Sequence, residues 1–411
     1  MTRPSSPTPP RPLEGVRVTD LTSVLMGPAA TQILADYGAD VIKVELPEGD
    51  IMRHAGHMKH KGMGPVFLHA NRNKRSIAID LKKPSGCEAL RGLIASSDLF
   101  VHNVRPAALA RLGLDGAALV AGQPRLICLA LVGFDQHGPY APLPAVDDAI
   151  QGISGMASLV ARQTGGEPAY SPMVVVDRLC AVNAAQSALA ALYLREKTGR
   201  GQYIELPMFE TAASVVLGDH MGGETFDPPA GPTGYSRLLA RDRRPFRTKD
   251  GHVALLVYTD GQWRRFFEAI GQPEVFTNDE RLTTAAMRAR NYDFSYALLT
   301  GILRERSSAA WVELLQRFDI PCMLLHDPDS LLGDPHLAKT GFFEMIEHPS
   351  EGRLRSMKVA ARWSDADLSV RRHAPRIGEQ SVEVLRELGF DQARIGRLLA
   401  SGAVVQCPAS D

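Results

Sequence analysis

The chain lacks long hydrophobic runs, an imbalance of charge and closely spaced cysteines. No apolar run among its 411 residues approaches the length of a membrane span, which is roughly 20 residues, and we expect no hydrophobic secretion signal at its start. Basic and acidic residues number 46 each, so no overall positive field favours nucleic acid. These absences predict a cytoplasmic protein that neither spans a membrane nor binds nucleic acid.

Metal-binding patterns are also missing. The five cysteines are widely scattered, which indicates buried thiols in a reducing compartment. His54, His57 and His60 recur every three residues, but in a Gly-rich loop without nearby cysteines or a carboxylate cluster. Because a structural metal site needs a fixed set of ligands, we predict no metal site. The cysteines are Cys87, Cys128, Cys180, Cys322 and Cys407.

The length of the chain predicts two domains, because one ordinary core rarely grows this large. Residues 1–12 are rich in proline and serine and are predicted to form a disordered tail. Residues 222–247 are rich in Gly, Pro and Arg and predict a loop that enters the second domain. We expect a large domain from 13–220 and 341–411, and a smaller α/β domain from 230–335.

Short apolar strands alternate with helices in the first third of the chain. We expect strands at 16–21, 40–46, 76–81, 99–104 and 125–132, and helices at 29–37, 84–95 and 106–120. Successive strand–helix–strand units form right-handed crossovers, so the predicted fold class is α/β with a Rossmann-like, doubly wound large domain. The GxGxxG fingerprint is missing from TSVLMGPAA after the first strand, so the fold suggests a nucleotide-like ligand without the usual NAD motif.

Basic residues gather near the expected ends of neighbouring sheet elements. Lys74 lies in NRNKRS, Arg105 lies in HNVRP, and Arg111 follows within two helical turns. Strand carboxyl ends and helix N-termini of such sheets bind anions, so these residues could converge on phosphates. A solvated basic rim explains the pattern equally well.

Asp177 lies where a strand is expected to meet a long helix. The β-branched run 173–176 predicts the strand, and apolar residues three to four apart predict the helix. Asp177 is therefore expected to cap the helix and to stay ionised at neutral pH. Such a carboxylate is a candidate nucleophile, although capping alone explains most aspartates at this position. The apolar positions are Leu179, Val182, Ala185, Leu189 and Leu192.

Many segments, in matching order and spacing, resemble the class III CoA-transferase family, which includes carnitine-CoA transferase, formyl-CoA transferase and α-methylacyl-CoA racemase. The resemblance extends from Leu13 to APRIGEQSVEVLRELG near the end of the chain. It implies a two-domain subunit and a homodimer whose chains are interlinked like rings. Among the matching segments are PLEGVRVTDLTSVLMGPAATQILADYGADVIKVELPEGD, NRNKRSIAIDLKKPSG, HNVRPAALARLGLD and LYLREKTGRGQYIEL.

The resemblance implies roles for individual residues. Asp177 matches the family's nucleophile, and Gly231 and Gly234 are candidates for a mobile loop over the substrate. Met26 departs from the family's usual alanine, and Leu46 replaces an arginine that binds CoA in some relatives, so the adenine and 3′-phosphate contacts are left open. The positions expected to contact CoA are Leu25, Met26, Lys74, Asn103, Arg105 and Arg111.

The implied activity is transfer of CoA from an acyl-CoA to a free carboxylic acid, through an aspartyl anhydride and an enzyme–CoA thioester. It needs no metal and no permanently bound cofactor, since CoA and acyl-CoA are substrates. The segment GYSRLL…DRRPFRTKDG is most similar to members that handle dicarboxylates and use succinyl-CoA. Its arginines suit carboxylates, or form a solvated loop. They are Arg237, Arg241, Arg243, Arg244 and Arg247.

Two alternatives to CoA transfer remain open, namely a racemase that epimerises a 2-methylacyl-CoA and a non-catalytic CoA-binding module. Racemases of the family use a histidine immediately before an aspartate, but Val146 occupies that position before Asp147. Valine cannot transfer a proton, and His137 lies nine residues earlier in a QHGPY turn. The third possibility is a non-catalytic CoA-binding module, which the presence of Asp177 argues against. The sequence therefore favours the transferase.

Overall fold

The computed structural model describes residues 9–408, which form two compact units. Unit 1 contains the chain up to Ile153, Ser171–Ala212 and the chain from Ala338, and unit 2 contains Ser154–Tyr170 and Ala213–Leu337. The sequence placed 154–170 and 213–220 in the large domain, whereas they cluster with unit 2. One reason is that Arg162 donates a hydrogen bond to the Thr233 carbonyl oxygen, which ties the earlier segment to unit 2.

The predicted disordered tail covers residues 1–12. Residues 1–8 lie outside the described part of the chain. Arg11, by contrast, forms an ion pair with Asp367 at 2.5 Å, and the Leu13 N–H donates to the Tyr37 carbonyl oxygen. Tertiary contacts therefore begin before residue 13.

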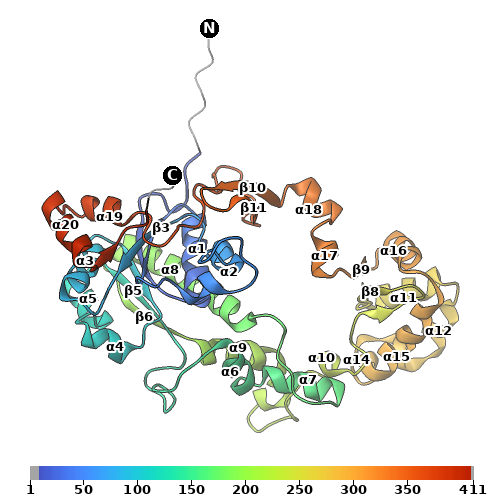
Figure 1. Ribbon diagram of the computed structural model, residues 1–411. Coiled ribbons are helices and arrows are strands. Elements are labelled where there is room, and N and C mark those ends of the chain that lie inside the picture. Colours follow the sequence, from blue (N-terminus) through green and yellow to red (C-terminus); the bar gives the residue numbers. More distant parts are fainter. Residues whose placement is uncertain (1–8, 409–411) are drawn as a thin grey trace. The chain divides into compact units, whose positions relative to one another are not determined.

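Unit 1 is built on a seven-stranded sheet with the order β12-β3-β2-β1-β4-β5-β6 (Figure 1). All neighbouring strands are parallel except β12, which runs antiparallel to β3 at the edge. The order 3-2-1-4-5-6 is that of a Rossmann-type sheet, and the direction of winding reverses between β1 and β4. The strands are β1 (Arg17–Leu21), β2 (Asp40–Glu45), β3 (Lys74–Ile79), β4 (Leu99–His102), β5 (Ile127–Val132), β6 (Tyr203–Pro207) and β12 (Val404–Val405).

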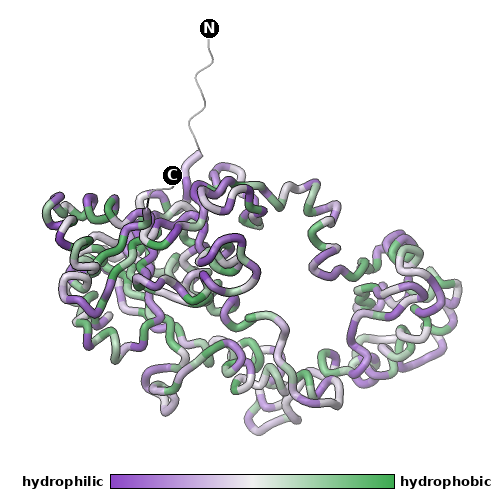
Figure 2. The backbone as a smooth tube through the Cα atoms, viewed as in Figure 1, coloured by the Kyte–Doolittle hydropathy of each residue, from purple (hydrophilic) through white to green (hydrophobic). Residues whose placement is uncertain are grey.

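Helices of unit 1 pack against this apolar sheet, whose strands include mostly hydrophobic stretches (Figure 2). Apolar residues of α3, α19 and α20 share one core with the strands, and the three helices lie together in Figure 1. The β10–β11 hairpin (Phe343–His348, Gly352–Met357) also belongs to this unit. The helices are α1 (Met26–Asp36), η1 (Ile51–His54), α2 (Pro65–Ala70), α3 (Pro84–Ala95), α4 (Pro106–Arg111), α5 (Gly116–Gly122), α6 (Asp147–Ile153), α8 (Val175–Thr198), α19 (Ser381–Glu387) and α20 (Gln392–Ala400).

Helix α8 packs against α1, and its buried face consists mainly of small residues. Of the apolar positions named from the sequence, Ala185 and Leu192 are buried, whereas Val182 is 57% exposed. Alanine side chains let two helices approach closely, so the buried stripe is poor in large residues and weak as a sequence signal. The buried alanines of α8 are Ala181, Ala184, Ala185, Ala188 and Ala191.

Two further boundaries differ from the sequence prediction. The expected strand at 173–176 is wrong, because Val175 and Val176 already belong to α8, and tertiary packing overrides their β preference. The expected helix at 106–120 is two helices, α4 and α5. They are separated at Gly113, whose φ of +67° ends a right-handed helix.

Unit 2 has a three-stranded antiparallel sheet, β7-β8-β9, covered by short helices. Its core is aromatic, with Trp263, Phe266 and Trp311 fully or almost fully buried. Helices α9 (Met208–His220) and α18 (Pro335–Thr340) span the boundaries between the units. The other elements are α7 (Met156–Thr164), η2 (Gly222–Thr225), α10 (Ser236–Leu239), β7 (Phe246–Arg247), β8 (His252–Leu255), α11 (Asp260–Ala269), α12 (Pro273–Asn278), α13 (Glu280–Thr283), α14 (Ala285–Ala289), α15 (Tyr292–Ile302), η3 (Leu303–Glu305), α16 (Ser308–Arg317), β9 (Cys322–Leu324) and α17 (Pro328–Leu331).

Between residues 9 and 408, no helix has the length and apolar character needed to cross a membrane. The five cysteines are free thiols, four of them buried and Cys407 partly exposed.

Candidate active site

A cavity of about 790 Å³ lies in unit 1 where β1, β4 and β5 end. The turn after β1, residues 103–108 and the segment after β5 line it, together with residues from α8 and α9. β1 and β4 are the neighbours at which the winding of the sheet reverses, and open α/β sheets leave a crevice at that point. The position of the cavity therefore follows from the topology of the sheet.

Asp177 lies on the wall of this cavity as the third residue of α8. It is 9% exposed and does not cap the helix, which corrects the sequence prediction. Instead, the Asp177 N–H donates to Oδ2 of Asp147 at 2.9 Å. Asp177 was expected to accept an N–H group at the start of its helix. It instead donates its own N–H, and the carboxylate that accepts it belongs to α6.

The Asp177 carboxylate has an unusual environment for an aspartate in a first helical turn. No group among residues 9–408 donates a hydrogen bond to it. Burial and the Asp147 carboxylate raise the pKa of Asp177 to about 6, and Arg178 partly opposes this rise. We expected the helix terminus to favour the charged form, but desolvation is the larger effect. About nine-tenths of such a group is still ionised at pH 7.

Asp147 is fixed beside Asp177 by a second side chain. Gln151, one turn further along α6, donates from Nε2 to Oδ1 of Asp147 at 2.5 Å. Oε1 of Gln151 accepts the Ser171 N–H at 2.9 Å, which holds the segment that leads into α8. Sequence reasoning noted Asp147 only beside Val146 and missed this role. The available signal was an aspartate pair, Asp147–Asp148, at the start of a short helix.

The turn between β1 and α1 forms another wall and is held from two sides. Asn103 accepts the Ser23 N–H at 3.0 Å and donates to the Ser23 carbonyl oxygen at 2.9 Å. Asp50 accepts the Val24 N–H at 3.2 Å. Val24 has a φ of +70°, a strained value for a β-branched residue that persists only where surrounding contacts impose it.

Gly27 is required at the start of α1. A Cβ there would lie 2.3 Å from Cβ of Thr22, so any larger residue would push the helix away from the turn. Met26 reaches the cavity, whereas Leu25 is buried and does not line it. The glycine of GPAA therefore allows the start of α1 to lie close to Thr22 in the turn after β1. One role of the glycines in a dinucleotide fingerprint is a close approach of this kind.

Arg105 and Arg111 supply positive charge to the cavity. Both line it, both are exposed, and within residues 9–408 neither forms an ion pair with a carboxylate. They lie at the N-cap and the last residue of α4, directly after β4. Two unpaired guanidinium groups beside a groove suit a phosphate-bearing ligand.

Lys74 is not brought to this cavity. Its ammonium group is buried, and burial lowers the pKa of Lys74 to about 8 although Asp20 opposes the shift. Nζ donates to Oδ2 of Asp20 at 3.0 Å and to the Asn71 side chain, Thr31 and the Pro28 carbonyl oxygen at 2.8 Å each. Its place as the first residue of β3 turns the side chain toward the base of α1 rather than toward the groove.

The predicted loop glycines belong to the other unit. Gly231 and Gly234 lie in unit 2 and do not line the Asp177 cavity. Gly234 has a φ of +117°, and a Cβ there would lie 2.8 Å from Nη2 of Arg162. Its conformation therefore requires glycine. Among residues 9–408 no group of three or more His, Cys, Asp or Glu side chains could hold a metal ion.

A desolvated carboxylate and two unpaired guanidinium groups at the reversal point of a Rossmann-like sheet define a candidate site for an anionic, nucleotide-bearing substrate. Residues 13–381 match the family described as CoA-transferase family III. The chain belongs to this family of CoA-transferases.

Named relatives and a solved structure agree with this membership. The chain is 28% identical to human succinyl-CoA:glutarate CoA-transferase, covering 96% of this chain and 90% of the human protein. It is 30% identical to succinyl-CoA–D-citramalate CoA-transferase of Chloroflexus aurantiacus, covering 93% and 96%. A CAIB/BAIF family protein from Brucella suis matches with a TM-score of 0.76 and 28% identity, covering 92% of this chain and 100% of that one.

Proposed function

We propose that this chain moves CoA from an acyl-CoA to a free carboxylic acid, with Asp177 as the nucleophile. The observation that carries the proposal is the Asp177 carboxylate itself. It is buried on the cavity wall, it accepts no hydrogen bond from residues 9–408, and its pKa is raised to about 6. A carboxylate that is poorly solvated yet mostly ionised is a better nucleophile than one in water.

The exchange balances without a metal or an external base. A carboxylate oxygen of Asp177 attacks the thioester carbonyl carbon, the C–S bond breaks, and CoA thiolate leaves from an aspartyl–acyl anhydride. The thiolate then attacks the aspartyl carbonyl carbon, which releases the first acid and leaves an enzyme–CoA thioester. An acceptor carboxylate repeats the two steps in reverse, and Asp177 is regenerated as a carboxylate.

The acyl donor that we propose is succinyl-CoA, with a dicarboxylate as acceptor. Two relatives of comparable identity are named for succinyl-CoA, and their acceptors are glutarate and D-citramalate. The test is to incubate the protein with succinyl-, propionyl- and isobutyryl-CoA and a panel of free acids, and to identify new thioesters by mass spectrometry. Succinyl-CoA should give the fastest transfer. If no new thioester forms from any pair, the transferase proposal fails and a non-catalytic CoA-binding chain is favoured.

The same samples separate transfer from epimerisation. Val146 lines the cavity and cannot exchange a proton, while His137 lies in an exposed turn, contacts Asp135 and does not line the cavity. In deuterated water, the α-hydrogen of isobutyryl-CoA should therefore remain unexchanged. Rapid deuterium uptake that depends on Asp177 would favour the racemase over the transferase.

Arg105 and Arg111 are proposed to hold the phosphates of CoA, with Asn103 and Met26 beside them. Changing either arginine to glutamine should weaken CoA binding by about tenfold, because charge-assisted contacts are lost. The loss should be larger at low salt than at high salt, since ions screen exposed charges. Isothermal titration calorimetry measures both effects, and Arg397→Gln, an exposed change on α20, is the matched control. Unchanged affinity in both variants would place the phosphates elsewhere.

We also propose the interlinked homodimer that the family resemblance implies. Linked chains cannot separate without unfolding, so dilution should yield no folded monomer. Analytical ultracentrifugation decides the point, and a stable, active monomer would contradict it.

A further inference from the structure

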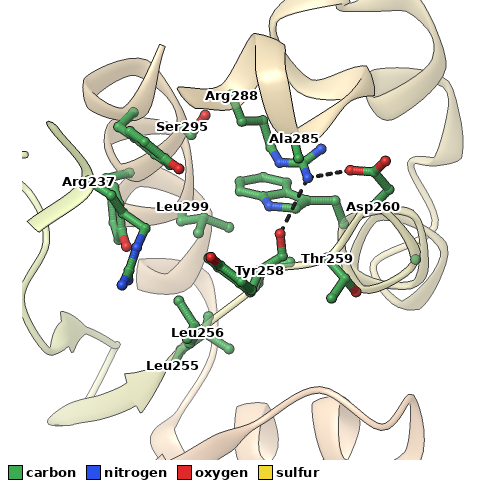
Figure 3. Close-up of a pocket in the computed structure, with 15 residues that line it drawn as sticks. Arg237, Leu255, Leu256, Tyr258, Thr259, Asp260, Ala285, Arg288, Ser295 and Leu299 are labelled. Atoms are coloured by element: carbon green, nitrogen blue, oxygen red, sulfur yellow. Dashed lines mark hydrogen bonds and ion pairs between the residues drawn. The ribbon is translucent and has the colours of Figure 1, made fainter. Parts of the chain in front are cut away.

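A second cavity, of about 470 Å³, lies entirely among residues of unit 2 (Figure 3). It opens at the end of β8 and is enclosed by residues of α10, α11, α14 and α15. None of its lining residues belongs to the Asp177 cavity. Its walls are mostly aromatic and aliphatic, including Tyr258, Trp263, Tyr292, Tyr296, Leu255 and Leu299. Such a lining suits the apolar body of a small molecule.

The cavity contains two arginines that differ in how they are neutralised. Arg288 is 3% exposed, forms an ion pair with Asp260 and donates to the Tyr258 carbonyl oxygen (Figure 3). It also donates to the Leu282 carbonyl oxygen. Arg237, by contrast, has no carboxylate within ion-pair distance among residues 9–408. Since Asp260 balances Arg288, the lining carries one net positive charge, and it belongs to Arg237.

Arg237 is held in place by tyrosines instead of by an acid. Its Nε donates to Oη of Tyr235 at 3.2 Å. Its guanidinium carbon lies 5.2 Å from the ring centre of Tyr235 and 5.4 Å from that of Tyr258. Contacts of this kind orient a guanidinium group without cancelling its charge. Tyr296 also forms a side-chain hydrogen bond with this guanidinium group. The N–H groups that the two tyrosines leave unused are available for a second planar partner.

We propose that this cavity binds a carboxylic acid with an apolar body, and that Arg237 pairs with the carboxylate. One net positive charge matches one carboxylate, and the planar fork of arginine fits the two carboxylate oxygens. The aromatic and aliphatic walls provide surface for an aryl or alkyl group. A multiply charged phosphate ester would leave negative charge uncompensated against these apolar walls. The inference is independent of the proposed role of Asp177.

The test uses the full-length protein and three probes that share one apolar body. They are 4-phenylbutyrate, its uncharged amide, and 4-phenylbutylamine. Calorimetry, supported by tryptophan fluorescence because Trp263 lines the cavity, should show that the acid binds about tenfold or more tightly than the amide, since a charge-assisted pair is lost. The amine should bind most weakly, because its charge repels Arg237.

Variants locate the binding. Arg237→Gln should lower affinity for the acid about tenfold or more, and Arg237→Lys, which keeps the charge, should lose less. Arg304→Gln is the matched control, since Arg304 is an exposed arginine of unit 2 that does not line the cavity. Thermal melts establish that each variant is folded.

The proposal is overturned by equal binding of the acid and the amide, by full binding by a folded Arg237→Gln variant, or by no binding of the acid at millimolar concentration. Asp177→Asn and saturation with CoA should leave binding of the acid intact. If either abolishes it, the acid occupies the Asp177 cavity and the proposal fails. Because these readouts do not depend on transfer activity, the failure of one proposal is distinguishable from the failure of the other.

Discussion

Asp177→Asn is expected to abolish CoA transfer and, at the same time, to make the folded chain more stable at pH 7. The first effect follows if the carboxylate is the nucleophile, because an amide cannot form the anhydride; a loss of about 10³-fold or more is expected. The second follows from the environment of the side chain. Asp177 is buried beside Asp147, and no group among residues 9–408 donates a hydrogen bond to its carboxylate. The charge on Asp177 therefore destabilises the folded state.

The sign of the stability effect depends on pH. The folded-state pKa of about 6 lies above the ordinary value of 3.8, so the folded chain holds this proton more tightly than the unfolded chain. Stability from this group is therefore fully present below the ordinary pKa and is lost as pH rises through about 6. The Asp177→Asn variant does not lose this stability as pH rises, because asparagine carries no titrating group. The gain at neutral pH is expected to be on the order of 1–3 kcal/mol, since each pKa unit corresponds to about 1.4 kcal/mol.

Urea unfolding of both proteins from acid to neutral pH measures this difference, and mass spectrometry measures transfer. Asp148→Asn, which removes an exposed charge at the next position to Asp147, is the matched control and should change neither property greatly. The activity of the natural chain should fall as pH drops through about 6, where Asp177 takes up its proton. Full transfer by Asp177→Asn would remove Asp177 from the mechanism. A stability gain that does not vary with pH would refute the raised pKa.

The sheet could be read from the sequence because its signals are local. Each strand from β1 to β5 is a short apolar run beside a helix, and the helix at Pro84–Ala95 has the predicted bounds. Parallel pairing then follows from the crossover rule. The reversal point between β1 and β4, and with it the cavity, follows from the order of the strands. Arg105 and Arg111 were placed at this edge by the same reasoning, whereas Asn103 was assigned to the CoA groove by the family resemblance alone.

The environment of the candidate nucleophile could not be read in this way. Asp147 lies 30 residues from Asp177, and only the fold brings its carboxylate to the start of α8. The cavity of unit 2 depends similarly on tyrosines and arginines from α10, α14, α15 and the segment that follows β8. Lys74 shows the opposite error. A lysine in a polar run looks solvated, but its partner Asp20 lies 54 residues earlier on a neighbouring part of the sheet.

Lys74→Met is expected to destabilise the fold by about 3–5 kcal/mol, because removing one partner of a buried ion pair leaves the other charge uncompensated. Lys74 and Asp20 are both fully buried at the side chain. Burial alone would raise the pKa of Asp20, but Lys74 and Lys43, with the hydroxyls of Thr22 and Thr31, hold it below its ordinary value. Thr22 belongs to the turn after β1 and Thr31 belongs to α1, and both hydroxyls donate hydrogen bonds to Asp20. The buried network therefore holds in place the turn and helix that form one wall of the cavity.

Two observations distinguish this structural role from direct contact with CoA. Without Lys74, the buried Asp20 should favour its protonated form, so the stability deficit of Lys74→Met should shrink as pH falls toward the acid range. The double variant Lys74→Met with Asp20→Asn removes the stranded charge and should recover much of the stability, with CoA affinity near that of the natural chain. Urea unfolding and calorimetry measure both. A surface lysine that only contacts phosphate would behave differently: Lys74→Met would cost about 0.5 kcal/mol or less in stability, and Asp20→Asn would not restore the lost CoA affinity. That result would place Lys74 in the CoA groove and contradict its buried contact with Asp20.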